Sequence, residues 1–407
     1  MKRRVPVGDF KIDEEEKKAI SDVMEGGRIS EWKKVKEFED IFANYIGTKY
    51  CIAVSSGTSA LLIGLLALLY DGRFPKVQKG AKVIASPVTY VSTVNAIILA
   101  GFEPVFIDID KRTFTLNTEQ LEEVISKEPE SFAGIIPVHL MGYPNDMNEI
   151  NRIAEQYSLF VLEDSAQAHG TIYNGKKAGS LGLLSSFSFY IAHNIQAGEM
   201  GCVTTDDRKL YQLMKQLKSN GRLCSCEICT RNTGQCPGSS KYDDIGDYDP
   251  RFTFEYVSYN FKTTEFPAAL AVSQVKQADS IFLKRLSNVK YLNEHLEQFS
   301  ELFYLPVFSE DISYLAYPIM LTEGCAFSRK WIRKELENRG IENRPLFGCL
   351  PTQQPVFAHM RAEYRSKLPN ANYVGENAFY IGCHQYLEKA DLDYIVKMFE
   401  AILTKGI

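Results

Sequence analysis

Residues 48–205 alternate short apolar segments with helical patterns, and this rhythm limits the fold to the α/β class. Each expected helix shows apolar residues every three or four positions, whereas the expected strands are short and rich in aliphatic residues. The strands are expected at 50–56, 82–87, 103–109, 134–140 and 159–164, and the helices at 58–70, 92–101, 117–127 and 145–157. This order predicts a mostly parallel sheet with helices on both faces. Ligands are then expected at the carboxyl ends of the strands.

Beyond this region the pattern changes twice. A helix is expected over 206–219, followed by a polar stretch that is too long and irregular for a simple connection. A long helix, 265–300, then leads into a region of strand and helix patterns, for example 315–321 and 390–403. We therefore expect a large domain over 1–275 with a cysteine-containing loop inserted at 220–250, and a smaller C-terminal α+β domain over 276–407. The N-terminal helices are able to pack on the small domain.

The composition is that of an ordinary globular protein, with 45% hydrophobic and 24% charged residues. A net charge of −5 argues against nucleic acid or an anionic membrane as the main partner. The longest apolar run, 59–70, is too short to cross a bilayer, and the N-terminus lacks the apolar block of a signal peptide. We therefore expect a cytoplasmic protein without nucleic-acid or membrane partners.

Three motifs follow expected strands. In SSGTSAL (55–61), Ser56 and Thr58 open a helix, where backbone N–H groups and hydroxyls can hold a phosphate. Asp164 ends a strand and is suited to pair with a protonated pyridine nitrogen, and Tyr90 is placed to stack on a ring. Each motif alone also fits a structural role, as a helix cap for the first two and as packing for Tyr90.

Taken in order, SSGTSAL, PVTYVSTVNAI, PVFIDID, LEDSAQAHG, SFSFYIAHNIQAGEMG, SYNFKTTEFPAA and ENRPLF resemble the sugar aminotransferases of the DegT/DnrJ/EryC/StrS family. The likeness runs from the expected helix near residue 33 to the last helix. It implies the type I aspartate-aminotransferase fold, a pyridoxal-phosphate-type cofactor, a nucleotide-linked keto-sugar substrate and an active site shared across a homodimer.

The resemblance also implies roles for individual residues. Phosphate contacts fall to Ser56, Gly57, Thr58 and Ser188, with Asn260 reaching the phosphate from the other subunit. Tyr90 stacks on the ring, Asp164 pairs with the ring nitrogen and Gln167 touches the ring hydroxyl. Arg344 is expected at the substrate mouth, either as a ligand contact or in a structural salt bridge.

His193 stands where the aminotransferases of this family carry the lysine that attaches the cofactor. Imidazole cannot form that attachment, but it is suited to move a proton near neutral pH. The likeness is therefore to the sugar 3-dehydrases that use pyridoxamine phosphate, in which His193 and Asp164 are the catalytic residues. The alternatives are a non-catalytic relative and an aminotransferase that uses another lysine, with Lys262 the nearest candidate. The other five histidines are expected to be packing or solvated residues.

Four of the nine cysteines, Cys224, Cys226, Cys229 and Cys236, lie within thirteen residues with the spacing C-x-C-x2-C-x6-C. By spacing alone this set fits zinc or an iron–sulfur cluster equally. It resembles the local ligands of the CDP-4-keto-6-deoxyglucose 3-dehydrase type, which carries a [2Fe–2S] cluster and accepts electrons from an NAD(P)H-dependent flavin/iron–sulfur reductase. That type has one ligand upstream, at a position matching about Ala166, so Cys229 is expected to replace it. The metal-free GDP-4-keto-6-deoxymannose 3-dehydratase type is the alternative.

Overall fold

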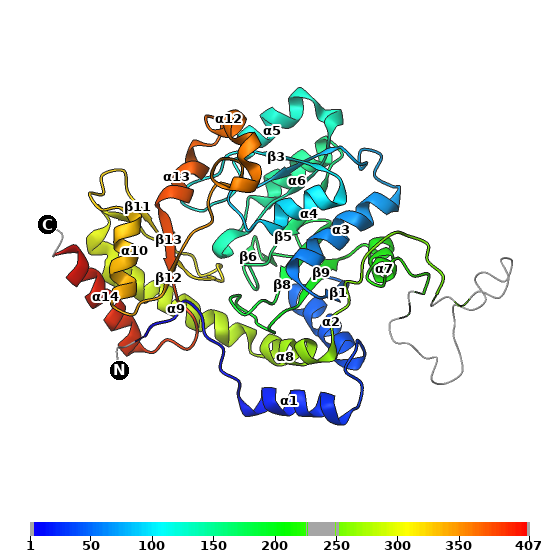
Figure 1. Cartoon of the computed structure of the whole chain (residues 1–407), viewed down its shortest axis with the longest axis horizontal. Coiled ribbons are helices and arrows are strands. Elements are labelled where there is room, and N and C mark those ends of the chain that lie inside the picture. The colour runs from blue at the N-terminus through cyan, green and yellow to red at the C-terminus, as the bar shows by residue number, and fades with distance from the viewer. Residues whose placement is uncertain (1–3, 225, 227–248, 250–251, 405–407) are drawn as a thin grey trace.

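The computed structural model describes residues 4–224, 226, 249 and 252–404. These form a large sheet and a smaller C-terminal sheet with their helices, and a short two-stranded sheet of β6 Ile172–Tyr173 and β7 Lys176–Lys177 (Figure 1). The larger sheet has seven strands in the order β1-β9-β8-β5-β4-β2-β3. These strands are β1 Tyr50–Val54, β2 Lys82–Ala85, β3 Glu103–Phe106, β4 Phe132–Ile136, β5 Phe160–Asp164, β8 Leu184–Ser188 and β9 Gly201–Thr205. Its helices are α1 Glu14–Glu25, α2 Lys33–Ile46, α3 Gly57–Asp71, α4 Ser92–Ala100, α5 Thr118–Lys127, α6 Met147–Gln156, α7 Arg208–Leu217 and α8 Glu265–Lys276.

The larger sheet is mostly parallel, which confirms the predicted class. Strands β3, β2, β4, β5 and β8 run parallel to one another, and β9 is antiparallel to both β1 and β8. The five expected strands are all present. Strands β8 and β9 were not among them, because serines interrupt the apolar pattern of β8 and two threonines end β9.

Both faces of this sheet are covered by apolar side chains. In β1, Ile52 and Val54 belong to the core that includes α3, whereas Cys51 and Ala53 belong to a second core with α2 and α8. Helix α3 has buried residues along its whole length, because it packs on the sheet as well as on α4 and α7. A strand that is buried on both sides needs an almost continuous apolar sequence, as β1 has.

The C-terminal part contains a four-stranded antiparallel sheet in the order β10-β11-β13-β12. Its strands are β10 Phe303–Tyr304, β11 Tyr317–Leu321, β12 Asn343–Pro345 and β13 Ala378–Ile381. The helices are α9 Ala278–Leu296, α10 Arg329–Asn338, α11 Leu350–Gln353, α12 Arg361–Tyr364, α13 Pro369–Asn377 and α14 Lys389–Leu403. The α+β character is as expected, while the domain boundary near 275 stays a prediction.

The expectation of one helix over 265–300 is wrong. Helix α8 ends at Lys276 and α9 begins at Ala278, with Gln277 between them at φ −97° and ψ 0°. The break has a packing reason, since α8 lies against α1 and α2 whereas α9 lies against α14. Ahead of α1, Val5 pairs with Ile341 of the C-terminal part.

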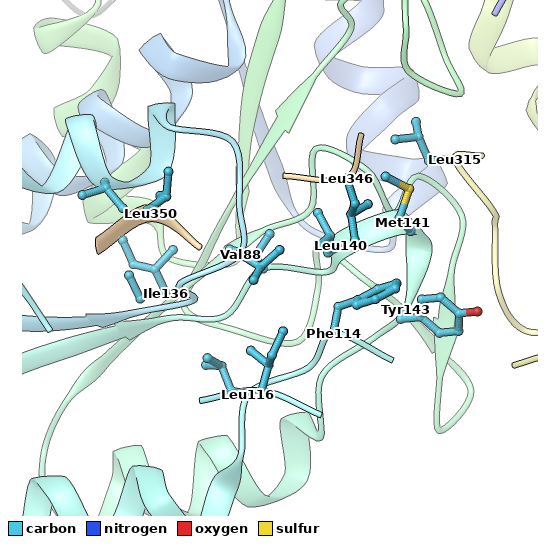
Figure 2. Packing of buried hydrophobic residues seen from close by; sticks show 14 of the residues in the cluster. Val88, Phe114, Leu116, Ile136, Leu140, Met141, Tyr143, Leu315, Leu346 and Leu350 are labelled. Carbon is cyan, nitrogen blue, oxygen red and sulfur yellow. The ribbon is translucent and has the colours of Figure 1, made fainter. Parts of the chain in front are cut away.

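The two parts are joined by a shared core near the carboxyl ends of the large sheet. Figure 2 shows Leu315, Leu346 and Leu350 of the C-terminal part among buried residues that follow strands of the large sheet, such as Val88 and Leu140. The N–H of Leu350 also donates to the carbonyl of Pro87 at 2.8 Å. This core holds the C-terminal part beside the strand ends where ligands are expected. Within the described ranges, no helix has the length and apolar character needed to cross a membrane.

Candidate active site

A cavity of about 440 Å³ opens at the carboxyl ends of the large sheet, as the strand order predicts. Its wall is built from the segments that follow β1, β2, β4, β5 and β8, together with residues of the C-terminal part and the N-terminal Val7. The sequence-predicted residues that line it are Ser56, Gly57, Thr58, Tyr90, Asp164, Gln167, Ser188, His193 and Arg344. Segments that are far apart in the sequence therefore meet at one site.

Asp164 lies at the end of β5 with its carboxylate buried in the cavity wall. The Thr93 hydroxyl donates to Oδ2 at 2.8 Å, and the Ala166 N–H donates to Oδ1 at 3.3 Å. Burial raises the pKa of Asp164, and the hydrogen bond from Thr93 opposes that rise. A buried carboxylate is stable as an anion when a cation faces it, so this position suits a protonated ring nitrogen. The sequence did not single out Thr93, although it lies one turn after Tyr90.

The first turn of α3 forms an anion cradle with β8. Ser56 is the N-cap of α3, and its hydroxyl accepts from the Ser59 N–H at 3.1 Å, so the capping role expected as an alternative is present. A Cβ placed on Gly57 would lie 2.6 Å from the Ser188 Cβ, which means that only glycine allows β8 to approach this closely. The N–H groups of a first turn lack partners within the helix and carry positive partial charge. The cradle therefore fits a phosphate.

Two further side chains can face a ring between this cradle and Asp164. Tyr90 is 59% exposed, and its ring centroid lies 5.8 Å from that of Phe347. The amide oxygen of Gln167 accepts from the Met141 N–H at 2.9 Å. Because the oxygen of Gln167 is already engaged, its NH₂ group is the part of this side chain that can donate to a ligand.

His193 lies in a turn after β8 that is fixed from several sides. The backbone N–H of His193 donates to the Tyr190 carbonyl at 2.8 Å. The side-chain NH₂ of the neighbouring Asn194 donates to the Ser313 hydroxyl at 2.7 Å. The pKa of His193 is lowered to about 4, mainly by burial and also by the nearby charge of Arg285. A contact with the Ser188 backbone opposes this shift. The imidazole is therefore neutral near pH 7 and can accept a proton. In the described part of the chain, no lysine lines the cavity.

Asn260 and Lys262 lie outside the lining of this cavity. Asn260 is exposed on the surface and forms a bridge with Ser219, and its side-chain oxygen accepts from the Lys262 N–H at 3.3 Å. The structure contains a single subunit, so the predicted contact of Asn260 with a phosphate in the other subunit is not tested. Lys262 is half-buried, and burial lowers its pKa.

The cavity is also lined by residues of β12 and β13. Arg344 lines it and pairs with Glu342 at 3.2 Å, so the salt bridge and the ligand-facing position that the sequence left open both occur. Tyr380, from the neighbouring strand, and Glu199 also line the cavity. Neither was expected from the sequence: Tyr380 lies in none of the quoted motifs, and Glu199 lies near the end of SFSFYIAHNIQAGEMG without an assigned role.

The cysteine cluster is only partly visible. Cys224 is half-buried and Cys226 is exposed, whereas Cys229 and Cys236 lie outside the described residues. Over residues 4–224, 226, 249 and 252–404, no group of three or more potential metal ligands lies together. The four-thiol metal site therefore stays a prediction. Of the other five cysteines, Cys325 is half-buried, and four are buried: Cys51, Cys202, Cys349 and Cys383.

Comparison with known proteins agrees with this geometry. The chain is 31% identical over 405 residues, 97% of its length, to 86% of a dTDP-4-dehydro-2,6-dideoxy-D-glucose 3-dehydratase of Saccharopolyspora spinosa. It is 30% identical over 98% of its length to 99% of a GDP-perosamine synthase of Caulobacter vibrioides. A structure of Escherichia coli GDP-4-keto-6-deoxy-D-mannose-3-dehydratase with bound hydrated PLP covers 97% of this chain and 99% of its own, at 26% identity and a TM-score of 0.85.

The fold is thus that of the type I aspartate aminotransferases, as the resemblance implied. The family profile described as the DegT/DnrJ/EryC1/StrS aminotransferase family matches residues 10–400, nearly the whole chain. The chain belongs to this family.

Proposed function

We propose that this protein is a pyridoxamine-phosphate-dependent 3-dehydratase of a nucleotide-linked 4-keto-6-deoxyhexose, acting in deoxysugar biosynthesis. The observation that carries the proposal is a neutral His193 in a cavity that also contains an anion cradle and the buried Asp164, with no lysine in the described lining. Similarity to two proteins named as sugar 3-dehydratases supports it. A nucleotide sugar is the class of substrate named for these relatives and for the perosamine synthase.

The bound cofactor would supply an amine that joins the sugar's keto carbon and a ring that spreads negative charge. Gly57, Thr58 and Ser188 hold its phosphate. Asp164 keeps the ring nitrogen protonated, and Thr93 orients that carboxylate. His193 removes a proton at the 4′ carbon and delivers one to the departing hydroxyl at carbon 3 of the sugar. Arg344 and Tyr380 at the mouth are placed to meet the nucleotide or the sugar.

We propose a homodimer in which Asn260 completes the phosphate site of the partner. The segment around Asn260 supports this, since Phe252, Phe254, Val257 and Tyr259 are exposed apolar residues. A patch of this kind on a soluble chain is typical of a contact surface. The proposal also includes a cytoplasmic location, in line with the metabolite class of the substrate.

The second candidate is a transamination, the reaction after which the matched family is named, and the chain is about as similar to a GDP-perosamine synthase as to the dehydratases. Product analysis separates the two. Protein loaded with pyridoxamine phosphate is incubated with CDP-, GDP-, dTDP- and UDP-linked 4-keto-6-deoxyhexoses, and the products are examined by mass spectrometry and NMR. We expect loss of the carbon-3 hydroxyl from at least one substrate. A glutamate-dependent 4-amino sugar with an intact carbon-3 hydroxyl would contradict the proposal, and a protein that binds no cofactor would be the non-catalytic relative.

We further propose that Cys224, Cys226, Cys229 and Cys236 bind a [2Fe–2S] cluster, which would deliver electrons from a separate reductase to the dehydrated sugar. Thiolates are the preferred ligands of such clusters. Cys224 is half-buried and Cys226 is exposed. The backbone N–H of the preceding Leu223 donates to the Thr253 carbonyl at 2.9 Å, and this hydrogen bond fixes the backbone where the first two ligands begin. Zinc is the alternative metal, and a metal-free enzyme is the alternative without electron transfer.

Replacement of one cluster ligand tests this. Cys224→Ser in anaerobically purified protein should abolish the iron, the acid-labile sulfide and the reductase-dependent formation of 3-deoxy sugar, because a cluster needs all four ligands. Pyridoxamine phosphate binding should stay within about threefold, since the Cys224 side chain is not part of the cavity lining. The matched control is Cys325→Ser, another half-buried free thiol, which should keep the cluster. Stoichiometric zinc without sulfide in the wild-type protein, or turnover without an electron donor, would contradict the cluster.

A further inference from the structure

Behind His193 lies a group of buried polar atoms that have no hydrogen-bond partner in the protein. They are both ring nitrogens of His169, Nδ1 of His193, the side-chain oxygen of Asn194 and Nε of Arg285. Buried polar groups in folded proteins nearly always have partners, either in the protein or in ordered water. A concentration of exceptions next to a candidate base therefore calls for an explanation.

His169 is the centre of this group. Its side chain is fully buried, and its ring lies among Phe42, Phe187 and Phe189, with centroids 5.2 to 6.3 Å away. The centroid of the His193 ring is 6.2 Å from that of His169, and the two rings make no direct hydrogen bond. The packing alone would suit a phenylalanine at position 169. A histidine there places two hydrogen-bonding nitrogens in an apolar setting.

The charge of Arg285 favours the neutral form of both histidines. This arginine extends from α9, is fully buried, and donates from Nη1 to the Leu315 carbonyl at 2.8 Å. Among the described residues, no carboxylate lies within ion-pair distance of it. Its charge lowers the pKa values of His169 and His193, as does their burial. Both histidines are therefore neutral near pH 7. A neutral, uncharged hydrogen-bond partner such as water suits them better than a carboxylate.

The centroids of the two rings are 6.2 Å apart, and nitrogens on facing ring edges are nearer to each other than the centroids. Hydrogen bonds of about 2.9 Å from a single water can join nitrogens that are between about 4 and 6 Å apart. Buried waters make about three hydrogen bonds each, so the same molecule has capacity for one more partner, such as the oxygen of Asn194. Asn194 is itself held by Ser313, which fixes that oxygen.

We propose that a buried water links His169 to Nδ1 of His193, and that this link holds the proton on Nδ1. The tautomer of an imidazole is set by the hydrogen bond that its other nitrogen makes. With the proton held on Nδ1, Nε2 is the nitrogen that accepts the proton from the cofactor. This inference rests on the proposed role of His193 as the base, and it makes His169 a positioning residue.

The tautomer of His193 is a direct readout that does not require turnover. In protein labelled with ¹⁵N-histidine and free of cofactor, the six histidines are observed by NMR, and the His193 signal is assigned by its loss in His193→Asn. We expect the Nδ1–H form in the wild-type protein. His169→Leu and His169→Phe should shift His193 towards a mixture of tautomers, because the water loses its anchor. His169→Gln, which can still bind a water, should retain the wild-type signal.

The same variants are then tested for exchange of the cofactor's 4′ hydrogen with solvent. The apolar variants should lose about ten- to a hundredfold in exchange rate, the usual effect of removing a partner that orients a functional histidine. His169→Gln should recover most of that loss, and His295→Leu, at an exposed histidine, should change nothing. An unchanged His193 tautomer in both apolar variants would overturn the inference. Wild-type exchange in His193→Asn would instead overturn the proposed function while leaving the tautomer result standing.

Discussion

His193→Asn should slow exchange of the cofactor's 4′ hydrogen by roughly a hundred- to ten-thousandfold, the range that general-base catalysis contributes. Asparagine has nearly the shape of histidine but cannot accept a proton at neutral pH. Affinity for pyridoxamine phosphate should stay within about threefold, because the first turn of α3 at Gly57 and the Asp164 carboxylate are held by contacts that do not involve the imidazole. The measurement is the loss of deuterium from the labelled cofactor, followed by mass spectrometry.

His384→Asn is a suitable control for this experiment. His384 is also buried, and burial lowers its pKa to about 4, as for His193, but it is not part of the cavity lining. Its replacement should leave the exchange rate within about threefold. Exchange at the wild-type rate in His193→Asn would mean that another group removes the proton, with Glu199 the first carboxylate to examine because it lines the same cavity.

The parts of this site that the sequence predicted correctly share one property. Ser56, Tyr90 and Asp164 each lie at or just after the carboxyl end of an expected strand, and strand ends in a parallel sheet meet at one edge. Once the strands were recognised from their apolar pattern, the meeting of these residues followed. The likeness in motif order added the position of His193, which no periodicity would mark.

What the sequence did not predict depends on contacts between distant segments. Arg285 acts on His193 from α9, which begins after a break at Gln277 that local helix propensity does not predict. Tyr380 enters the site because β13 pairs with β12, the strand of Arg344. Such contacts form only when the whole core is assembled, so they cannot be predicted from the pattern of one segment.

His193→Lys should convert the protein into one that attaches pyridoxal phosphate covalently. The ε-amine of lysine is a nucleophile towards the cofactor's aldehyde, whereas imidazole is not. The surroundings of position 193 favour the neutral, reactive amine, because burial and the charge of Arg285 both disfavour a cation there. Dehydration should fall by at least about a hundredfold, since the lysine holds the cofactor in its aldehyde form and the imidazole base is gone.

The attachment is measured by borohydride reduction and mass spectrometry of the peptide that contains residue 193. His295→Lys provides the matched control, because it places a new lysine at an exposed histidine on α9, where no stoichiometric attachment is expected. Attachment at Lys262 in the wild-type protein would support the aminotransferase alternative, in which a lysine outside the described cavity lining reaches the ring from the partner subunit. A His193→Lys protein that dehydrates its substrate well and carries no attached cofactor would show that position 193 does not face the ring. That result would also remove the reason for assigning the base to His193, because both roles require the same atom of the cofactor to be within reach of this side chain.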